Sequence, residues 1–150
     1  MNLLESQLAT DKVYQTLMAK HQWECLPFKH EYSLIDGIIV KEKKIVAIYE
    51  LKTRDIKFET LCKQYNDEFL ISKSKLDAGV QMSKQTRTPF VLILNTTIDD
   101  NIFIKSITND NGEIICQYRI EKTKTKKNID GGVAIRDNAF IKMFNVFSIK

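Results

Sequence analysis

The sequence predicts a mixed α/β fold in which helices cover both faces of a sheet. Segments 33–40 and 45–52 are rich in β-branched residues and largely apolar on both faces, which is typical of strands buried between two layers. Segments 3–21 and 74–85, which flank them in the chain, have apolar residues at helical spacing. These observations favour an α/β sandwich over an antiparallel sheet that is covered on one side only.

The length and composition predict one globular domain comprising residues 1–150. The chain is 43% hydrophobic and 28% charged, and its 150 residues are enough to bury a core. Its first residues lack the positive start and unbroken apolar run of a signal peptide, and no apolar stretch is long enough to cross a membrane. We therefore expect a soluble cytoplasmic protein with no membrane partner.

The cysteines and histidines show no spacing that suits a metal or a disulfide framework. Cys25, Cys62 and Cys116 are odd in number and far apart, and zinc sites need paired spacings. His21 and His30 also have no partner at ligand spacing. We expect reduced cysteines and histidines without a function.

The first helix is expected over residues 3–21, and a short extended piece over 23–26 precedes Pro27. The helix is predicted from apolar residues at helical spacing, namely Leu4, Leu8, Tyr14, Leu17 and Met18. The strands 33–40 and 45–52 then form a β-hairpin around a charged segment that lacks the Asn-Gly turn signal.

A second helix is predicted from Ser74 to about Gln85. Ser74 and Asp77 match a capping box in which aspartate replaces glutamate. We expect the apolar residues of this helix to face inward, namely Leu76, Val80 and Met82. Residues 54–68, before it, are either irregular or a short helix.

The remaining strands are predicted from short apolar runs. Residues 69–71 form a brief strand, and 90–94, after Pro89, form a buried one. Polar turns and a lysine-rich loop separate four further expected strands, at 102–107, 113–120, 133–136 and 140–144.

Asp36 and Glu50 are the unusual residues of the hairpin, because each is a carboxylate in an otherwise apolar strand. Burying an unpaired carboxylate costs several kcal/mol, so two of them indicate a site. Glu50 and Lys52 are two residues apart and therefore leave the same face of their strand.

The hairpin register decides whether the two carboxylates meet. Pairing of Val40 with Val46, around a loop centred on Lys43, places Asp36 opposite Glu50. Such a register needs a loop of odd length or a β-bulge, because a slip of one residue sends the side chains to opposite faces. Removing either carboxylate would then relieve repulsion between two close like charges.

Two carboxylates beside an ammonium group predict a site for a hard divalent cation. Mg²⁺ prefers oxygen ligands and is commonly held by one or two carboxylates together with a substrate phosphate. A bound ion polarises a phosphodiester and lowers the pKa of the attacking water, while the lysine orients that water and offsets negative charge. The pattern therefore predicts Mg²⁺-dependent phosphodiester hydrolysis, with Mn²⁺ as a substitute.

Asp36, followed by Glu50-Leu51-Lys52 on the next strand, resembles the D…(D/E)-x-K signature of the PD-(D/E)xK nuclease superfamily. That superfamily includes restriction endonucleases, Holliday-junction resolvases and small phage nucleases. Ile35 replaces the proline that often precedes the aspartate. The resemblance covers about residues 3–95 and implies a nuclease-like αβββαβ core. Residues 101–150 would be a strand-rich extension that covers the core, contacts DNA or builds a homodimer.

The resemblance also implies a function and a set of site residues. Asp36 and Glu50 would hold the metal together with the backbone carbonyl of Leu51, and Lys52 would complete the catalytic set. The expected activity is that of a Mg²⁺-dependent deoxyribonuclease in phage or mobile-element DNA processing, acting in the host cytoplasm. In some relatives a glutamate of the first helix also binds the metal, which makes Glu5 a candidate against its simpler role as a solvated helix residue.

Several basic and amide residues are candidates for contacts with nucleic acid. Lys75 and Gln81 could face the site from the second helix, or lie on its surface. The net charge of +4 arises in residues 101–150, which hold nine basic and five acidic residues. Four lysines of this region predict a phosphate-binding loop, with a solvated loop as the alternative: Lys122, Lys124, Lys126 and Lys127.

Two alternatives to an active nuclease remain at this point. The first is a catalytically inactive nuclease-fold module that binds nucleic acid or protein. The second is a small structural or regulatory protein in which Asp36 forms a turn beside Gly37. In that protein Glu50 and Lys52 would form an exposed ion pair.

Overall fold

A computed structural model of the chain describes residues 1–30, 33–124, 132–133, 135–143 and 145–149. In chain order its elements are α1 (Leu3–His21), β1 (Glu24–Pro27), β2 (Gly37–Lys41), β3 (Lys44–Arg54), α2 (Phe58–Gln64), β4 (Glu68–Ser72), α3 (Lys73–Thr86), β5 (Phe90–Thr96), β6 (Asn101–Ser106), β7 (Tyr118–Lys124), β8 (Ile135–Lys142) and β9 (Phe147–Ser148).

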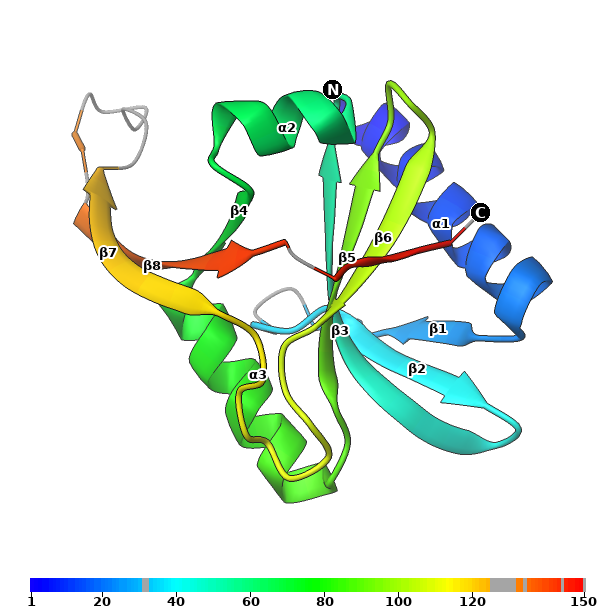
Figure 1. Ribbon diagram of the computed structural model, residues 1–150. Helices are drawn as coiled ribbons and strands as arrows, with labels where there is room; N and C mark the ends of the chain where they lie inside the picture. Colours follow the sequence, from blue (N-terminus) through cyan, green and yellow to red (C-terminus); the bar gives the residue numbers. More distant parts are fainter. Residues whose placement is uncertain (31–32, 125–131, 134, 144, 150) are drawn as a thin grey trace.

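The central sheet has the strand order β1-β2-β3-β5-β6-β9, and it lies between α1 on one face and α3 on the other (Figure 1). A smaller sheet, β4-β8-β7, lies on the α3 side. The expected α/β fold, with a sheet covered on both faces, is confirmed. No helix of the described ranges is both long and apolar enough to span a membrane.

The αβββαβ order that the resemblance implies is present. β1, β2 and β3 form an antiparallel meander, and α3 then leads to β5, which runs parallel to β3. The short α2 and the strand β4 are inserted between β3 and α3. β4 does not join the central sheet, because it pairs with β8 in the smaller one.

A β-bulge sets the register of the β2–β3 hairpin. Ile39 pairs with Ala47 as expected, but Val40 pairs with Ile45, so the expected Val40–Val46 pair is wrong. The turn has two residues, Glu42 and Lys43, both with positive φ (51° and 65°), as a type I′ turn requires. The turn of two residues and the bulge together keep the predicted pairs of Ile38 with Ile48 and of Ile39 with Ala47.

Each face of the central sheet carries its own apolar core. Ile48 and Leu92 face α3, whereas Tyr49 and Ile93 pack on the α1 side, and β5 is buried along its whole length. This alternation along β3 places Glu50 on the same face as Ile48, toward α3.

The contact between α1 and the sheet is narrower than expected. Val13 and Leu17 are buried against the sheet. Leu4, Leu8 and Met18, which share the apolar helical pattern with Leu17, are exposed and do not join the core. The helix packs on the sheet chiefly through its second half.

The helix α3 begins one residue earlier than predicted, and its cap is different. Ser72 is the N-cap residue, and its hydroxyl accepts a hydrogen bond from the backbone N–H of Lys75 at 3.3 Å. The predicted capping box at Ser74 is therefore wrong, and Asp77 instead pairs with Lys73 at 2.6 Å. β4 passes directly into α3 without a loop, which moves the cap to the last strand residue.

Gly79 allows α3 to lie close to β5. A Cβ atom at this position would lie 2.2 Å from the ring of Phe90, well inside van der Waals contact. Leu76 is buried on the same face of α3, while Val80 and Met82 are partly buried against the same core. The predicted inward face of the helix is confirmed.

The C-terminal part differs most from the predicted strands. Residues 113–117 form no regular strand, and the neighbouring strand is instead β7 (Tyr118–Lys124). The two strands expected around Asp137 and Asn138 are a single strand, β8. The side chain of Asn138 is buried and donates a hydrogen bond to Thr123 of β7, so a polar residue is accommodated within the strand.

Two further differences concern the end of the chain and the cysteines. β9 was not predicted, and it pairs with β6. Cys25, Cys62 and Cys116 are free, as expected.

Candidate active site

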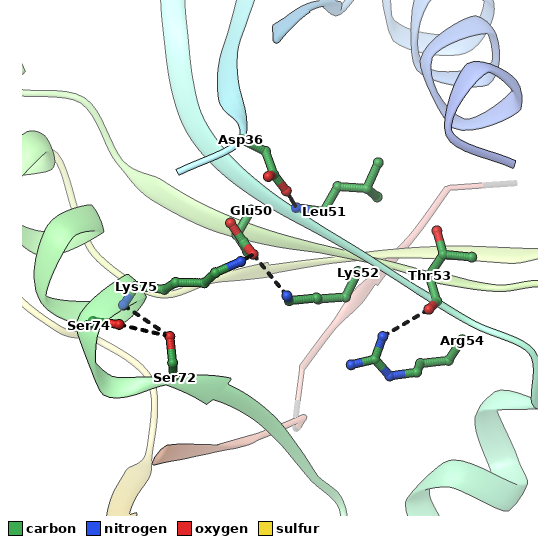
Figure 2. Close-up of polar contacts among 9 residues, drawn as sticks. All are labelled: Asp36, Glu50, Leu51, Lys52, Thr53, Arg54, Ser72, Ser74 and Lys75. Atoms are coloured by element: carbon green, nitrogen blue, oxygen red, sulfur yellow. Dashed lines mark hydrogen bonds and ion pairs between the residues drawn. The ribbon is translucent and has the colours of Figure 1, made fainter. Parts of the chain in front are cut away.

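Glu50 is buried in β3 between two lysines. Its side chain is 1% exposed, and its Oε1 atom lies 3.1 Å from Lys52 Nζ and 2.5 Å from Lys75 Nζ (Figure 2). Lys52 comes from the same face of β3, as predicted, and Lys75 comes from the first turn of α3. The alternative of an exposed Glu50–Lys52 pair is wrong, because the carboxylate is buried.

The second oxygen of Glu50 is buried and makes no hydrogen bond within the part of the chain that the structure describes. A buried polar atom without a partner is costly, and native proteins rarely keep one without a reason. A hard cation is a suitable partner for such an oxygen. The chemistry of this atom therefore fits the predicted metal site.

Asp36 lies just before β2, beside the backbone of Leu51. Its Oδ2 atom accepts a hydrogen bond from the Leu51 N–H at 2.6 Å, and its own N–H donates to the carbonyl of Tyr49 at 3.2 Å (Figure 2). β2 begins at Gly37, so Asp36 does not form the expected ladder pair with Glu50. Its carboxylate instead continues the hydrogen bonding of β3 where β2 ends.

The position of Asp36 also indicates the direction in which the carbonyl group of Leu51 projects. In a β-strand the N–H and C=O of one residue project toward the same neighbouring strand. The Leu51 carbonyl therefore projects to the side on which Asp36 binds the Leu51 N–H. The three expected oxygen donors therefore come from the adjacent β3 residues Glu50 and Leu51 and from Asp36, which lies just before β2.

The two lysines differ in their protonation chemistry. Burial and the nearby Lys75 lower the pKa of Lys52, despite the opposing effect of Glu50. Burial also acts to lower the pKa of Lys75, but the hydrogen bond and charge of Glu50 outweigh it and the pKa is raised. The charge of Asp36 also acts to raise the pKa of Lys75. Lys52 is thus the easier of the two to deprotonate.

A cleft of about 390 Å³ lies next to Asp36, between α1 and the end of β3. Asp36 and Lys52 line it together with Ser6, Thr10 and Tyr14, which follow one another at four-residue spacing on α1. The Tyr14 hydroxyl is 2.7 Å from that of Tyr49, and burial raises the pKa of both. Sequence reasoning missed this row of hydroxyls, although its helical spacing was a usable signal.

Two other predicted residues lie on exposed surfaces of the helices. Glu5 completes a capping box at the start of α1, where its carboxylate accepts from the Asn2 N–H at 3.1 Å. Gln81 is exposed on α3.

The predicted lysine loop is only partly described. Lys122 and Lys124 lie on β7, an edge strand of the smaller sheet, and not in a loop. Lys126 and Lys127 lie outside the described residues.

The site has two acidic side chains, Asp36 and Glu50. Over the described ranges, no three His, Cys, Asp or Glu side chains gather as metal ligands. One or two carboxylates with a backbone carbonyl are sufficient for Mg²⁺, which retains several waters. This donor set suits an oxygen-binding cation and differs from a zinc centre.

Comparison with curated proteins and with solved structures gives no significant match. A family model described as "Phage putative PDDEXK endonuclease" matches residues 5–135. The matched segment contains α1 from Glu5 onward, the β1–β3 meander, α3 and β5, and with them every residue of the site described above. The chain therefore belongs to this phage family of PD-(D/E)xK endonucleases.

Proposed function

We propose that this protein is a Mg²⁺-dependent deoxyribonuclease that hydrolyses phosphodiester bonds of phage or host DNA. The observation that carries the proposal is the buried Oε2 atom of Glu50, which lies without a hydrogen-bond partner in the described structure. The other oxygen of the same carboxylate pairs with two lysines, and a second carboxylate, Asp36, binds the backbone N–H of the next residue, Leu51. Membership of an endonuclease family supports the same class of reaction.

The residues that would hold the cation are Asp36, Glu50 and Leu51. Glu50 would contribute Oε2, since its Oε1 atom is already bound by Lys52 and Lys75. Leu51 would contribute its carbonyl oxygen. When bound, Mg²⁺ polarises the phosphodiester and lowers the pKa of a water that attacks phosphorus, and Mn²⁺ supplies the same chemistry.

The two lysines divide the remaining work. Lys52, which leaves the same face of β3 as Glu50, orients the attacking water. Lys75 keeps its charge, because Glu50 raises its pKa, and it stabilises negative charge that develops on the phosphate oxygens. Both ammonium groups meet at one oxygen of Glu50, so this carboxylate also fixes their positions.

The test is a cleavage assay on supercoiled and linear DNA, with a metal titration and an excess of chelator. We expect cleavage with Mg²⁺ or Mn²⁺, no cleavage in chelator, and no cleavage by Asp36→Asn or Glu50→Gln. Glu59→Gln is the matched control, because Glu59 also pairs with a lysine, at 2.9 Å, but on the surface of α2.

The outcomes separate the proposal from its alternatives. Full activity in chelator would refute the metal mechanism. DNA binding without cleavage at any metal concentration would favour the inactive nuclease-fold module. Failure to bind DNA at low salt would favour a structural or regulatory protein. Faster cleavage of an RNA of the same sequence would reassign the substrate.

A further inference from the structure

A second cavity, of about 800 Å³, lies among α2, β4 and the β7–β8 strands. Its walls are mainly apolar and include Tyr65 from the end of α2, Leu70 from β4 and Phe140 from β8. The metal-site carboxylates do not line it. Arg54 lines both this cavity and the cleft beside Asp36, so the two spaces share one wall.

Two arginines lie over aromatic rings in this cavity. The guanidinium carbon of Arg54 is 5.3 Å from the centroid of the Phe69 ring, and that of Arg119 is 4.2 Å from the centroid of Phe140. Arg119 is fixed by a two-pronged pair with Glu68, whose carboxylate is buried (2.9 and 3.0 Å). Flat cationic and aromatic surfaces are thus held in place before any ligand arrives.

The cavity also carries hydrogen-bonding groups beside its flat surfaces. Asp55 and Glu68 also line it, and because a carboxylate oxygen can accept more than one hydrogen bond, both residues offer acceptors for amino groups. Flat cationic and aromatic surfaces beside hydrogen-bond acceptors suit a ligand that has a planar, electron-rich ring with polar edges and an attached negative charge. An aliphatic side chain would match them less well. A nucleobase on a phosphate backbone is such a ligand, and unpaired bases are commonly bound by aromatic and arginine planes.

The cavity lies within reach of the strand that would be cut. Arg54 is four residues after Glu50 on β3, a distance of about 13 Å at ~3.3 Å per strand residue. Its side chain lies on the same face of β3 as Lys52 (Figure 2). A DNA strand whose phosphate reaches Lys52 can therefore place a neighbouring base beyond Arg54.

We propose that this cavity binds one unpaired nucleobase of the DNA substrate, next to the phosphate that is hydrolysed. The inference rests on the proposed nuclease function and gives it a substrate preference. DNA with an extrahelical or single-stranded nucleotide is favoured over a fully paired duplex. Arg54 and Tyr65 are specificity-determining residues in this assignment, because they form the wall and rim of the base site.

The experiment measures DNA affinity in chelator, so that no cleavage occurs. Three duplexes are compared: one with a single unpaired adenine, one with an abasic residue at the same place, and one fully paired. We expect the unpaired adenine to bind about tenfold more tightly than the abasic residue, since stacking of one base on aromatic side chains is worth that much.

Variants locate the effect in the cavity. Tyr65→Ala should remove the preference for adenine, and Leu70→Trp should also remove it by filling the cavity. Both residues are partly exposed, so the fold should tolerate the changes. Tyr118→Ala is the matched control, because Tyr118 is a partly exposed tyrosine that does not line this cavity, and it should keep the preference.

The outcomes distinguish this inference from the nuclease proposal. Equal affinity for adenine and abasic duplexes, with Mg²⁺-dependent cleavage intact, would overturn the base site alone and leave the cavity to a protein partner. A preference for adenine that survives in both Tyr65→Ala and Leu70→Trp would also overturn it. A preference that these variants abolish, in a protein that cleaves no DNA, would support the base site and refute the nuclease.

Discussion

Glu50 of β3 and Lys75 of α3 form an ion pair of 2.5 Å that joins the central sheet to the helix above it. Lys52 binds the same oxygen of Glu50 from within the sheet. The strongest electrostatic partners of Glu50 are therefore two cations, and not the second carboxylate. This finding changes the expectation that removal of either carboxylate relieves repulsion.

We predict that Glu50→Gln lowers the free energy of unfolding by about 1–3 kcal/mol in the absence of metal, because two half-buried lysines lose their shared counter-charge. Asp36→Asn should change it by less than about 1 kcal/mol, since the amide oxygen can still accept the Leu51 N–H. Chemical denaturation in chelator measures both. A more stable Glu50→Gln protein would show that repulsion between the carboxylates dominates.

Lys75→Met should reduce the rate of DNA cleavage by about 100-fold, because the variant lacks one preorganised cation facing the phosphate. Lys73→Met is the matched control on the same helical turn, since Lys73 pairs with Asp77 at the surface. Single-turnover rates at saturating DNA separate this effect from weaker binding. Equal rates for the two variants would make Lys75 a purely structural residue.

The stability contributed by Glu68 should depend on pH. The hydrogen bonds from Arg119 hold the pKa of Glu68 below its usual value in the folded protein. Its contribution is then fully present above the unfolded pKa of about 4.3 and is lost as the pH falls through the lower folded pKa. Glu68→Gln should therefore be less stable than wild type at neutral pH, with the difference shrinking below about pH 4.

Denaturation curves at several pH values test this, with the exposed Glu113→Gln as control. A difference between wild type and Glu68→Gln that does not change with pH would contradict the predicted role of the Arg119 pair.

Neutralising Lys122, Lys124, Lys126 and Lys127 together should weaken DNA binding with little effect on folding. If these lysines bind phosphates, the slope of log affinity against log salt falls by about one for each phosphate that the variant no longer binds. Lys122 and Lys124 lie on an edge strand whose side chains are mostly exposed, so the changes should be tolerated. An unchanged slope would show that all four lysines are solvated surface residues that bind no phosphate.

The chemistry of the site could be predicted from the sequence because Asp36 and Glu50 are carboxylates within apolar segments of the sequence. The same apolar character hid the register: the residues of β2 and β3 are apolar on both faces, so a slip of one residue leaves the hydrophobic pattern almost unchanged. The bulge opposite Val40 therefore appears only in the structure.

Long-range pairing accounts for most of what the sequence did not predict. Phe69–Ile71 is a recognisable strand, but nothing in its pattern indicates that it pairs with β8 and leaves the central sheet. The cavity that contains Arg54 and Arg119 depends on this pairing. Lys75 was a sequence candidate, whereas its convergence with Lys52 on one oxygen of Glu50 was not predicted.

The close approach of α3 to Phe90 makes the site sensitive to a residue that has no side chain. Gly79 lies about one helical turn after Lys75, so any larger residue would press against the Phe90 ring and move the helix outward. Lys75 would then withdraw from Glu50, leaving that carboxylate with less positive charge around it. A substitution at Gly79 would thus make Glu50 bind a cation more tightly and make Lys75 bind the phosphate less well, although it alters no polar group of the site.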